Sequence, residues 1–193
     1  MVKISKNASS ADNQQERQEY YVGWIVGFVD GEGCFSVSIV RNERLKNGWQ
    51  VFPEFVVTQG KKSLFALEEL KEFFKCGKIF INTRYDNHRE PLYRYCVRSA
   101  DDIREKIIPF FQKYPLRTAK RDDFARFVTI LKIMKSGVHV TNKGMKKIAL
   151  IIQLMNRKKP SAYLVSSETT RQDRKATKDD KLTRRYSPNS MAT

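Results

Sequence analysis

The stretch YYVGWIVGFVDGEG, residues 20–33, constrains the fold most, because an apolar segment ends abruptly in two acids set between glycines. The apolar part is shorter than the roughly 20 residues that cross a bilayer, so it predicts a helix that packs against protein. Gly23 and Gly27 are four residues apart and therefore share one helix face. Each glycine costs a helix about 1 kcal/mol relative to alanine, so the pair indicates that another backbone approaches this face closely.

Asp30 and Glu32 lie at the end of the predicted helix, where the negative end of the helix dipole disfavours carboxylates. Gly31 and Gly33 allow a sharp exit from the helix. One interpretation is a helix stop with solvated acids. The other is a cation site, because a bound cation would offset the repulsion. Spacing alone leaves both interpretations open.

The formal net charge of the 193-residue chain is +16, which predicts a polyanionic partner and nucleic acid first. A membrane surface is the rival partner, but the sequence shows neither a long basic amphipathic helix nor a lipidation motif, so we expect no membrane association. The two histidines, His88 and His139, have no nearby nucleophile pattern, which argues against a hydrolytic triad.

Cysteine usage and the N-terminus bear on the compartment. Cys34, Cys76 and Cys96 lack metal-ligand spacing and are odd in number, so they predict reduced thiols. The sequence is polar through Glu19, which predicts no signal peptide. We therefore expect an intracellular protein, in a bacterial cytoplasm or an organelle (mitochondrion or chloroplast), that is not secreted.

Composition divides the chain into three predicted parts: a flexible arm over residues 1–18, one domain over 19–160, and a basic, disordered tail over 161–193. Within the domain, alternation predicts strands and a three-to-four spacing predicts helices. The expected helices cover residues 19–30, 61–75, 101–113, 118–135 and 143–156. The first expected strand begins at residue 34, and the other three cover residues 49–59, 78–84 and 92–99. Pro53 predicts a bulge or a sheet edge in the second strand.

The segment IVGFVDGEG, residues 25–33, resembles the signature of the LAGLIDADG homing endonucleases, an apolar helix that ends in D-G-D/E-G. The match is strong from Gly27 to Gly33 and departs at Val26 and Ile25, where the family usually has alanine and leucine. The element order over residues 19–155 follows the family, and the motif occurs once. The resemblance implies an α+β fold of order αββαββα, in which helices cover one face of a four-stranded antiparallel sheet.

The other face of the predicted sheet is polar and net basic. A solvated face is the commoner explanation for such a surface. However, Arg, Lys, Asn and Gln read base edges in the major groove, and in the family this face binds DNA. The residues that we expect to contact DNA, including two lysines just after the second strand, are Ser36, Ser38, Gln50, Lys61, Lys62, Lys78, Asn82, Arg84, Arg94 and Arg98.

The resemblance also implies roles for the chemistry. Glu32 is expected to be the catalytic metal ligand, assisted by the Gly31 carbonyl, and the metal to be Mg²⁺ or Mn²⁺, although on chemistry alone either acid could bind it. Gln59, at the end of the second strand, is expected to orient water. A lysine approaches the site from the segment before the long C-terminal helix in the family; the matching position reads Ala119, so Lys120 is the candidate.

A single motif supplies one acidic helix end, so the resemblance implies a homodimer in which Gly23, Gly27 and Asp30 lie at the interface. The expected function is an intron-encoded, site-specific DNA endonuclease that makes a metal-dependent double-strand cut at a long pseudo-palindromic site. One alternative is an RNA-binding maturase that assists splicing, with intron RNA as its partner. Another is a non-catalytic DNA-binding protein whose acids are structural caps; residues 136–142 form a longer loop than a helix-turn-helix uses.

Overall fold

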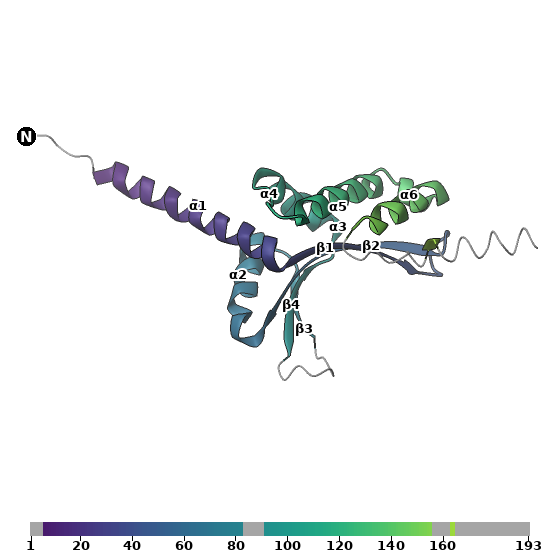
Figure 1. Cartoon of the computed structure of the whole chain (residues 1–193), viewed down its shortest axis with the longest axis horizontal. Coiled ribbons are helices and arrows are strands. Elements are labelled where there is room, and N and C mark those ends of the chain that lie inside the picture. The colour runs from purple at the N-terminus through teal and green to yellow at the C-terminus, as the bar shows by residue number, and fades with distance from the viewer. Residues whose placement is uncertain (1–5, 83–90, 156–162, 165–193) are drawn as a thin grey trace, which may run out of the picture.

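The computed structural model describes residues 6–82, 91–155 and 163–164 and has an α+β architecture (Figure 1). Four strands form one sheet, and helices cover one of its faces. The strands are β1 (Gly33–Arg41), β2 (Trp49–Gly60), β3 (Lys78–Asn82) and β4 (Leu92–Val97). The helical elements are α1 (Lys6–Glu32), η1 (Lys61–Ser63), α2 (Leu64–Phe74), α3 (Ala100–Asp102), η2 (Ile103–Ile107), α4 (Ile108–Lys113), α5 (Lys120–Lys135), η3 (Val138–Val140) and α6 (Asn142–Gln153).

The sheet is antiparallel throughout, in the order β1-β2-β4-β3, which confirms the predicted four-stranded sheet. β1 pairs with β2 from Gly33↔Val57 to Arg41↔Trp49 in one unbroken register. Pro53 therefore sits opposite Val37 without a bulge. The pairing of β2 with β4 begins only at Phe55, so Pro53 lies on a stretch of β2 that is an edge on its other side, where a missing N–H costs no ladder bond.

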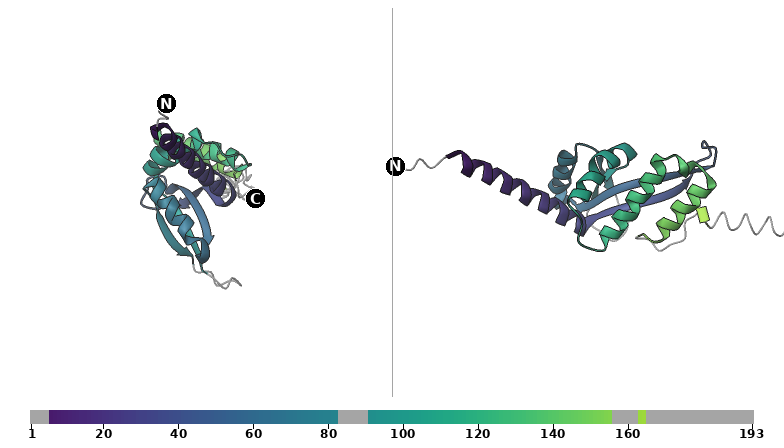
Figure 2. Two further views of the ribbon diagram at one scale, coloured as in Figure 1. Left: turned by 90° about the vertical axis from the view of Figure 1, so that its left-hand side faces the viewer. Right: turned by 90° about the horizontal axis from the view of Figure 1, so that it is seen from above.

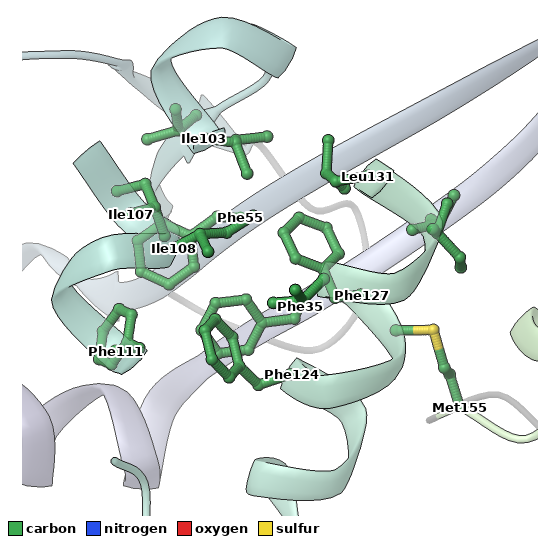
Figure 3. Packing of buried hydrophobic residues seen from close by; sticks show 14 of the residues in the cluster. Phe35, Phe55, Ile103, Ile107, Ile108, Phe111, Phe124, Phe127, Leu131 and Met155 are labelled. Carbon is green, nitrogen blue, oxygen red and sulfur yellow. The ribbon is translucent and has the colours of Figure 1, made fainter. Parts of the chain in front are cut away.

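Five phenylalanines, Phe35, Phe55, Phe111, Phe124 and Phe127, tie the sheet to the helices above it (Figure 3). Phe35 of β1 is fully buried, and its ring centroid lies 5.0 to 5.5 Å from the centroids of the other four rings. The pairs with Phe111 and Phe124 are edge-to-face, a geometry that adds to the stabilisation that burial provides. This cluster fixes β1, and with it the end of α1, against α4 and α5.

α1 begins at Lys6, so residues 6–18, within the segment predicted to be a flexible arm, belong to this helix. No glycine or proline interrupts residues 6–22, and Gln15 Nε2 donates a hydrogen bond to Glu19 Oε1 one turn later at 3.2 Å. The helix projects far beyond the rest of the domain (Figures 1 and 2). Among the described residues, no helix is both long and apolar enough to cross a membrane.

The C-terminal boundary also differs from the prediction. Tyr163 and Leu164 are buried, so the domain does not end at residue 160. The Tyr163 ring packs edge-on against Trp49 at 5.5 Å between centroids, and its hydroxyl group donates to the Asn142 carbonyl oxygen at 3.4 Å. The aromatic residue Tyr163, just after a polar stretch, was the signal in the sequence for this packing. The predicted tail beyond residue 164 lies outside the described residues.

Candidate active site and nucleic-acid interface

The end of α1 runs directly into β1 with no intervening loop. Gly33 makes this possible: a Cβ atom there would lie 2.6 Å from Val29 Cγ1 and 2.7 Å from the Val29 carbonyl oxygen. Only glycine fits such an approach. The sharp exit places Glu32, the last residue of the helix, at the edge of the sheet with its side chain exposed.

Asp30 binds the segment that leads into α5. Its carboxylate accepts hydrogen bonds from the Arg117 N–H at 2.8 Å and from the Thr118 hydroxyl group at 2.6 Å, and the Thr118 N–H donates to it as well. Partial burial raises the pKa of Asp30, but these hydrogen bonds outweigh burial and lower the pKa below its ordinary value. Asp30 therefore caps the segment before α5 within its own chain.

Lys120, the first residue of α5, reaches the same helix end. Its ammonium group donates hydrogen bonds to the carbonyl oxygens of Val29 at 3.0 Å and Gly31 at 3.1 Å. These carbonyls belong to the last turn of α1, which has no later N–H partners and attracts cations. Burial lowers the pKa of Lys120, while the nearby carboxylates of Asp30 and Glu32 oppose that shift. The candidate lysine thus lies beside the residue expected to bind metal.

The donor set around Glu32 suits a hard cation that keeps most of its water. Within the described chain, no group of three or more His, Cys, Asp or Glu side chains could hold a metal ion. Mg²⁺ is usually bound by one or two carboxylates together with phosphates and waters, so a lone exposed carboxylate fits it. The Gly31 carbonyl already accepts from Lys120, which leaves it one further lone pair.

Gln59 lies on the same side of the molecule as the end of α1. Gly33 pairs with Val57, so Gln59 is two residues further along β2, beyond the point where β1 begins. Lys61 and Lys62 follow in η1, and both are exposed. The register thus places the end of β2 near the start of β1, which directly follows the two acids.

The outer face of the sheet carries most of the residues expected to contact DNA. Ser36, Ser38, Gln50, Lys78, Asn82 and Arg94 occupy alternate positions that share this face by strand register. Arg98 lies just beyond the end of β4, and Arg84 lies outside the described residues. Cys96 shares the face by register but is only 2% exposed, because it lies on an inner strand between β2 and β3.

Glu54 of β2 neutralises part of this basic face. Its carboxylate forms ion pairs with Arg98, at 2.6 Å from Nε, and with Arg94, at 3.3 Å from Nη2. The hydrogen bond to Glu54 raises the pKa of Arg98 further. Strand alternation puts Glu54 on the outer face of β2, but only the β2–β4 register shows that it meets both arginines. The signal in the sequence was that Glu54 falls on the same face of its strand as Gln50, among the residues expected to contact DNA.

Gly23 and Gly27 face open space rather than their own chain. A Cβ atom built at either residue would have no neighbour within 4 Å. A groove runs beside this helix face, and its lining includes both glycines, Val22, Val26 and the segment from Lys113 to Arg117. The fold of a single chain therefore gives no reason for glycine at either position.

Comparison with known proteins agrees with this architecture. Residues 25–131 match the family model described as LAGLIDADG endonuclease. The chain belongs to this family, as its motif and element order predicted.

Relatives and solved structures point the same way. "Probable intron-encoded endonuclease 2" of Neurospora crassa is 31% identical over 141 residues, which cover 73% of this chain and 28% of that protein. The crystal structure of the homing endonuclease I-TnaI is similar with a TM-score of 0.64 and 40% identity, and the similarity covers 72% of this chain and 89% of that one. The structure of I-SmaMI bound to uncleaved DNA in the presence of calcium ions is similar with a TM-score of 0.66 and 37% identity. This similarity covers 74% of this chain and 47% of that one.

The chain spans only part of the length of several curated relatives that it matches. It spans 28%, 25% and 24% of the length of three of them. By contrast, it covers most of the I-TnaI chain.

Proposed function

We propose that this chain is a site-specific DNA endonuclease that hydrolyses phosphodiester bonds. The observation that carries the proposal is the exposed Glu32 carboxylate at the edge of a basic sheet, beside carbonyl groups that Lys120 holds in place. The sheet would bind the duplex, and the acidic helix end would meet its backbone. The similarity to a DNA-bound structure supports this arrangement.

Glu32 and the Gly31 carbonyl would hold a divalent metal ion, for which Mg²⁺ or Mn²⁺ fits the oxygen ligands. When bound, such an ion lowers the pKa of a water molecule and stabilises charge on the phosphate oxygens. Gln59 would orient the attacking water by hydrogen bonding. Lys120 would stabilise negative charge that develops on the phosphate, because a fixed cation in a partly buried site needs no reorganisation during the reaction.

Two copies of the chain are needed for a double-strand cut, because one copy brings one Glu32. The open glycine face of α1 supports a homodimer that packs helix to helix through Gly23 and Gly27. The hydrogen bonds of Asp30 to Arg117 and Thr118 place that acid within its own subunit, so its part in the interface would be indirect. A two-fold dimer would read a pseudo-palindromic site.

A helix-turn-helix regulator is a weaker explanation of the same fold. α5 ends at Lys135 and α6 begins at Asn142, with η3 between them, whereas a helix-turn-helix uses a turn of three or four residues. Phe127 of α5 and Ile148 of α6 are fully buried, so these helices serve the core.

The proposal is tested by incubating the full chain with duplex DNA that carries the insertion junction of its own gene without the insert. A double-strand cut that needs Mg²⁺ is expected. EDTA and a scrambled duplex are the controls. If the chain binds this duplex but never cuts it in Mg²⁺ or Mn²⁺, it is a DNA-binding protein and the endonuclease proposal is wrong.

A further inference from the structure

Glu54 lies on the outer face of β2 between two arginines from the β4 region. One carboxylate oxygen, Oε1, accepts from the Nε–H of Arg98 at 2.6 Å, and the other, Oε2, accepts from Nη2 of Arg94 at 3.3 Å. The Glu54 side chain is 15% exposed, whereas those of Arg94 and Arg98 are 33% and 44% exposed. The acid is therefore largely covered, and the guanidinium groups remain partly open on the surface proposed to meet DNA.

Two aromatic rings restrict Arg98 further. Its guanidinium carbon lies 5.7 Å from the ring centroid of Phe52 in β2 and 5.0 Å from that of Phe80 in β3. A cation is attracted to an aromatic face at such distances. β2 and β3 flank β4 on its two sides. Arg98 is thus held by contacts from both neighbouring strands, although it lies beyond the end of β4.

A carboxylate on a DNA-binding surface is unfavourable for general affinity, because non-specific binding comes from cations that neutralise phosphates. Glu54 must therefore contribute to something other than general affinity for DNA. An arginine already fixed in one orientation loses less rotamer entropy when it pairs with a base. Glu54 contacts Arg98 through Nε, and the two terminal amino groups take no part in that contact. An arginine fork of this kind matches O6 and N7 of guanine.

We propose that Glu54 is a positioning residue that orients Arg98 for guanine readout in the major groove. The inference rests on the proposed function, because it needs the outer face of the sheet to bind duplex DNA. It assigns sequence discrimination to Arg98 and the acid that orients it, and leaves general affinity to exposed cations such as Lys78. Removing the Glu54 charge should therefore move specific and non-specific binding in opposite directions.

The test is a binding selection without divalent metal, in which the full chain captures duplexes with a randomised central segment and the captured pool is sequenced. The wild type is expected to enrich guanine at one or two positions in each half-site. Glu54→Gln should reduce that preference roughly tenfold at those positions and leave the others unchanged. Its affinity for a duplex of mixed sequence should increase, because one negative charge is gone.

Two further variants make the result decisive. Glu105→Gln removes the same charge from an exposed residue of η2 and should leave every base preference unchanged. Arg98→Lys keeps the positive charge but loses the planar fork, so it should lose the same guanine positions as Glu54→Gln while it keeps the salt dependence of the wild type. If Glu54→Gln fails to fold, unchanged guanine positions in Arg98→Lys would still overturn the inference.

The outcomes separate the two proposals. If the wild type enriches a sequence and both Glu54→Gln and Arg98→Lys enrich the same one, Glu54 does not position a base-reading arginine, and only this inference is overturned. A uniform loss of affinity in Glu54→Gln, with unchanged preferences, overturns it as well. If the wild type enriches nothing, site-specific binding itself is wrong, and both proposals are overturned.

Discussion

Asp30 accepts a 2.6 Å hydrogen bond from the hydroxyl group of Thr118, a residue 88 positions later in the chain. This contact ties the end of α1 to the start of α5. It also separates the two acids of the motif by role, because Asp30 is used within the fold while Glu32, two residues on, is exposed.

Asp30→Asn should lower the free energy of unfolding by about 1 kcal/mol, because the charged acceptor of the Arg117 and Thr118 hydrogen bonds is lost at a partly exposed site. The pKa of Asp30 is lower in the folded chain than its ordinary value, so its contribution is present above the unfolded pKa and disappears as pH falls through the folded one. Denaturant unfolding should show a constant gap between wild type and variant above about pH 5, which closes in more acidic solution. Asp122→Asn, an exposed acid on α5, controls for the lost charge.

Glu32→Gln should abolish cleavage and leave DNA affinity nearly unchanged, because it removes the proposed metal ligand and leaves the basic face intact. Gel-shift affinity and single-turnover cleavage in Mg²⁺ measure the two effects separately. Its stability should match the wild type, since the Glu32 side chain is exposed. A variant that cuts at the normal rate would remove Glu32 from the active site.

Lys120→Met keeps the length of the side chain and removes its charge. Cleavage should slow on the order of 100-fold, as expected when one preorganised electrostatic contact is lost. The variant should still fold, because the two carbonyl oxygens of α1 that Lys120 contacts can accept hydrogen bonds from water. Lys132→Met, an exposed position on the same helix, is the matched control. Equal cleavage rates for the two variants would place Lys120 outside the reaction.

How far the sequence predicted this site depends on the distance over which each contact acts. Periodicity identified β1 and β2, because strand alternation is local, and the same alternation puts Glu54 on the outer face of β2. It could not show that Glu54 meets Arg94 and Arg98, since that depends on the β2–β4 register. Lys120 was placed only from the family resemblance, and its contact with Gly31 depends on how α5 packs.

At both ends of the domain, too, the local sequence did not predict the observed structure. The polar residues before Glu19 were expected to be unstructured because they bury little, yet an uninterrupted helix continues through them from Lys6. Helix propagation adds one hydrogen bond per residue once a turn exists, so a stable helix extends into a neighbouring polar segment that lacks glycine and proline. At the other end, Tyr163 packs against Trp49, a contact between distant residues that composition cannot reveal.

DNA binding should weaken steeply with salt, because the exposed cations of the outer face displace counterions from phosphates. Lys78→Gln should lower the slope of log affinity against log salt by about 1 and weaken binding to all sequences alike. Lys135→Gln, which removes an exposed lysine at the end of α5 in the helical layer, should leave the slope unchanged. An affinity that does not respond to salt would exclude a phosphate-contacting surface.

The glycines of α1 give the sharpest test of the dimer. Within one chain, a side chain at Gly27 meets nothing within 4 Å of its Cβ atom, so Gly27→Ala should stabilise the isolated helix by about 1 kcal/mol. In a helix-to-helix dimer the same position would be crowded, since contacting helices lie roughly 8 to 10 Å apart and small residues permit the lower limit. Gly27→Leu should overpack that contact and yield a monomer.

Sedimentation of the wild type and Gly27→Leu at micromolar concentration measures this directly, with Ala125→Leu on the exposed face of α5 as the control. We expect a wild-type dimer, a dimeric Ala125→Leu, and a folded Gly27→Leu monomer that makes no double-strand cut, because each subunit supplies a single Glu32. A single cooperative thermal unfolding transition of Gly27→Leu would show that the variant has lost the dimer and kept the fold. A wild-type monomer that still cuts both strands would rule out the symmetric arrangement and require a second catalytic centre in the same chain.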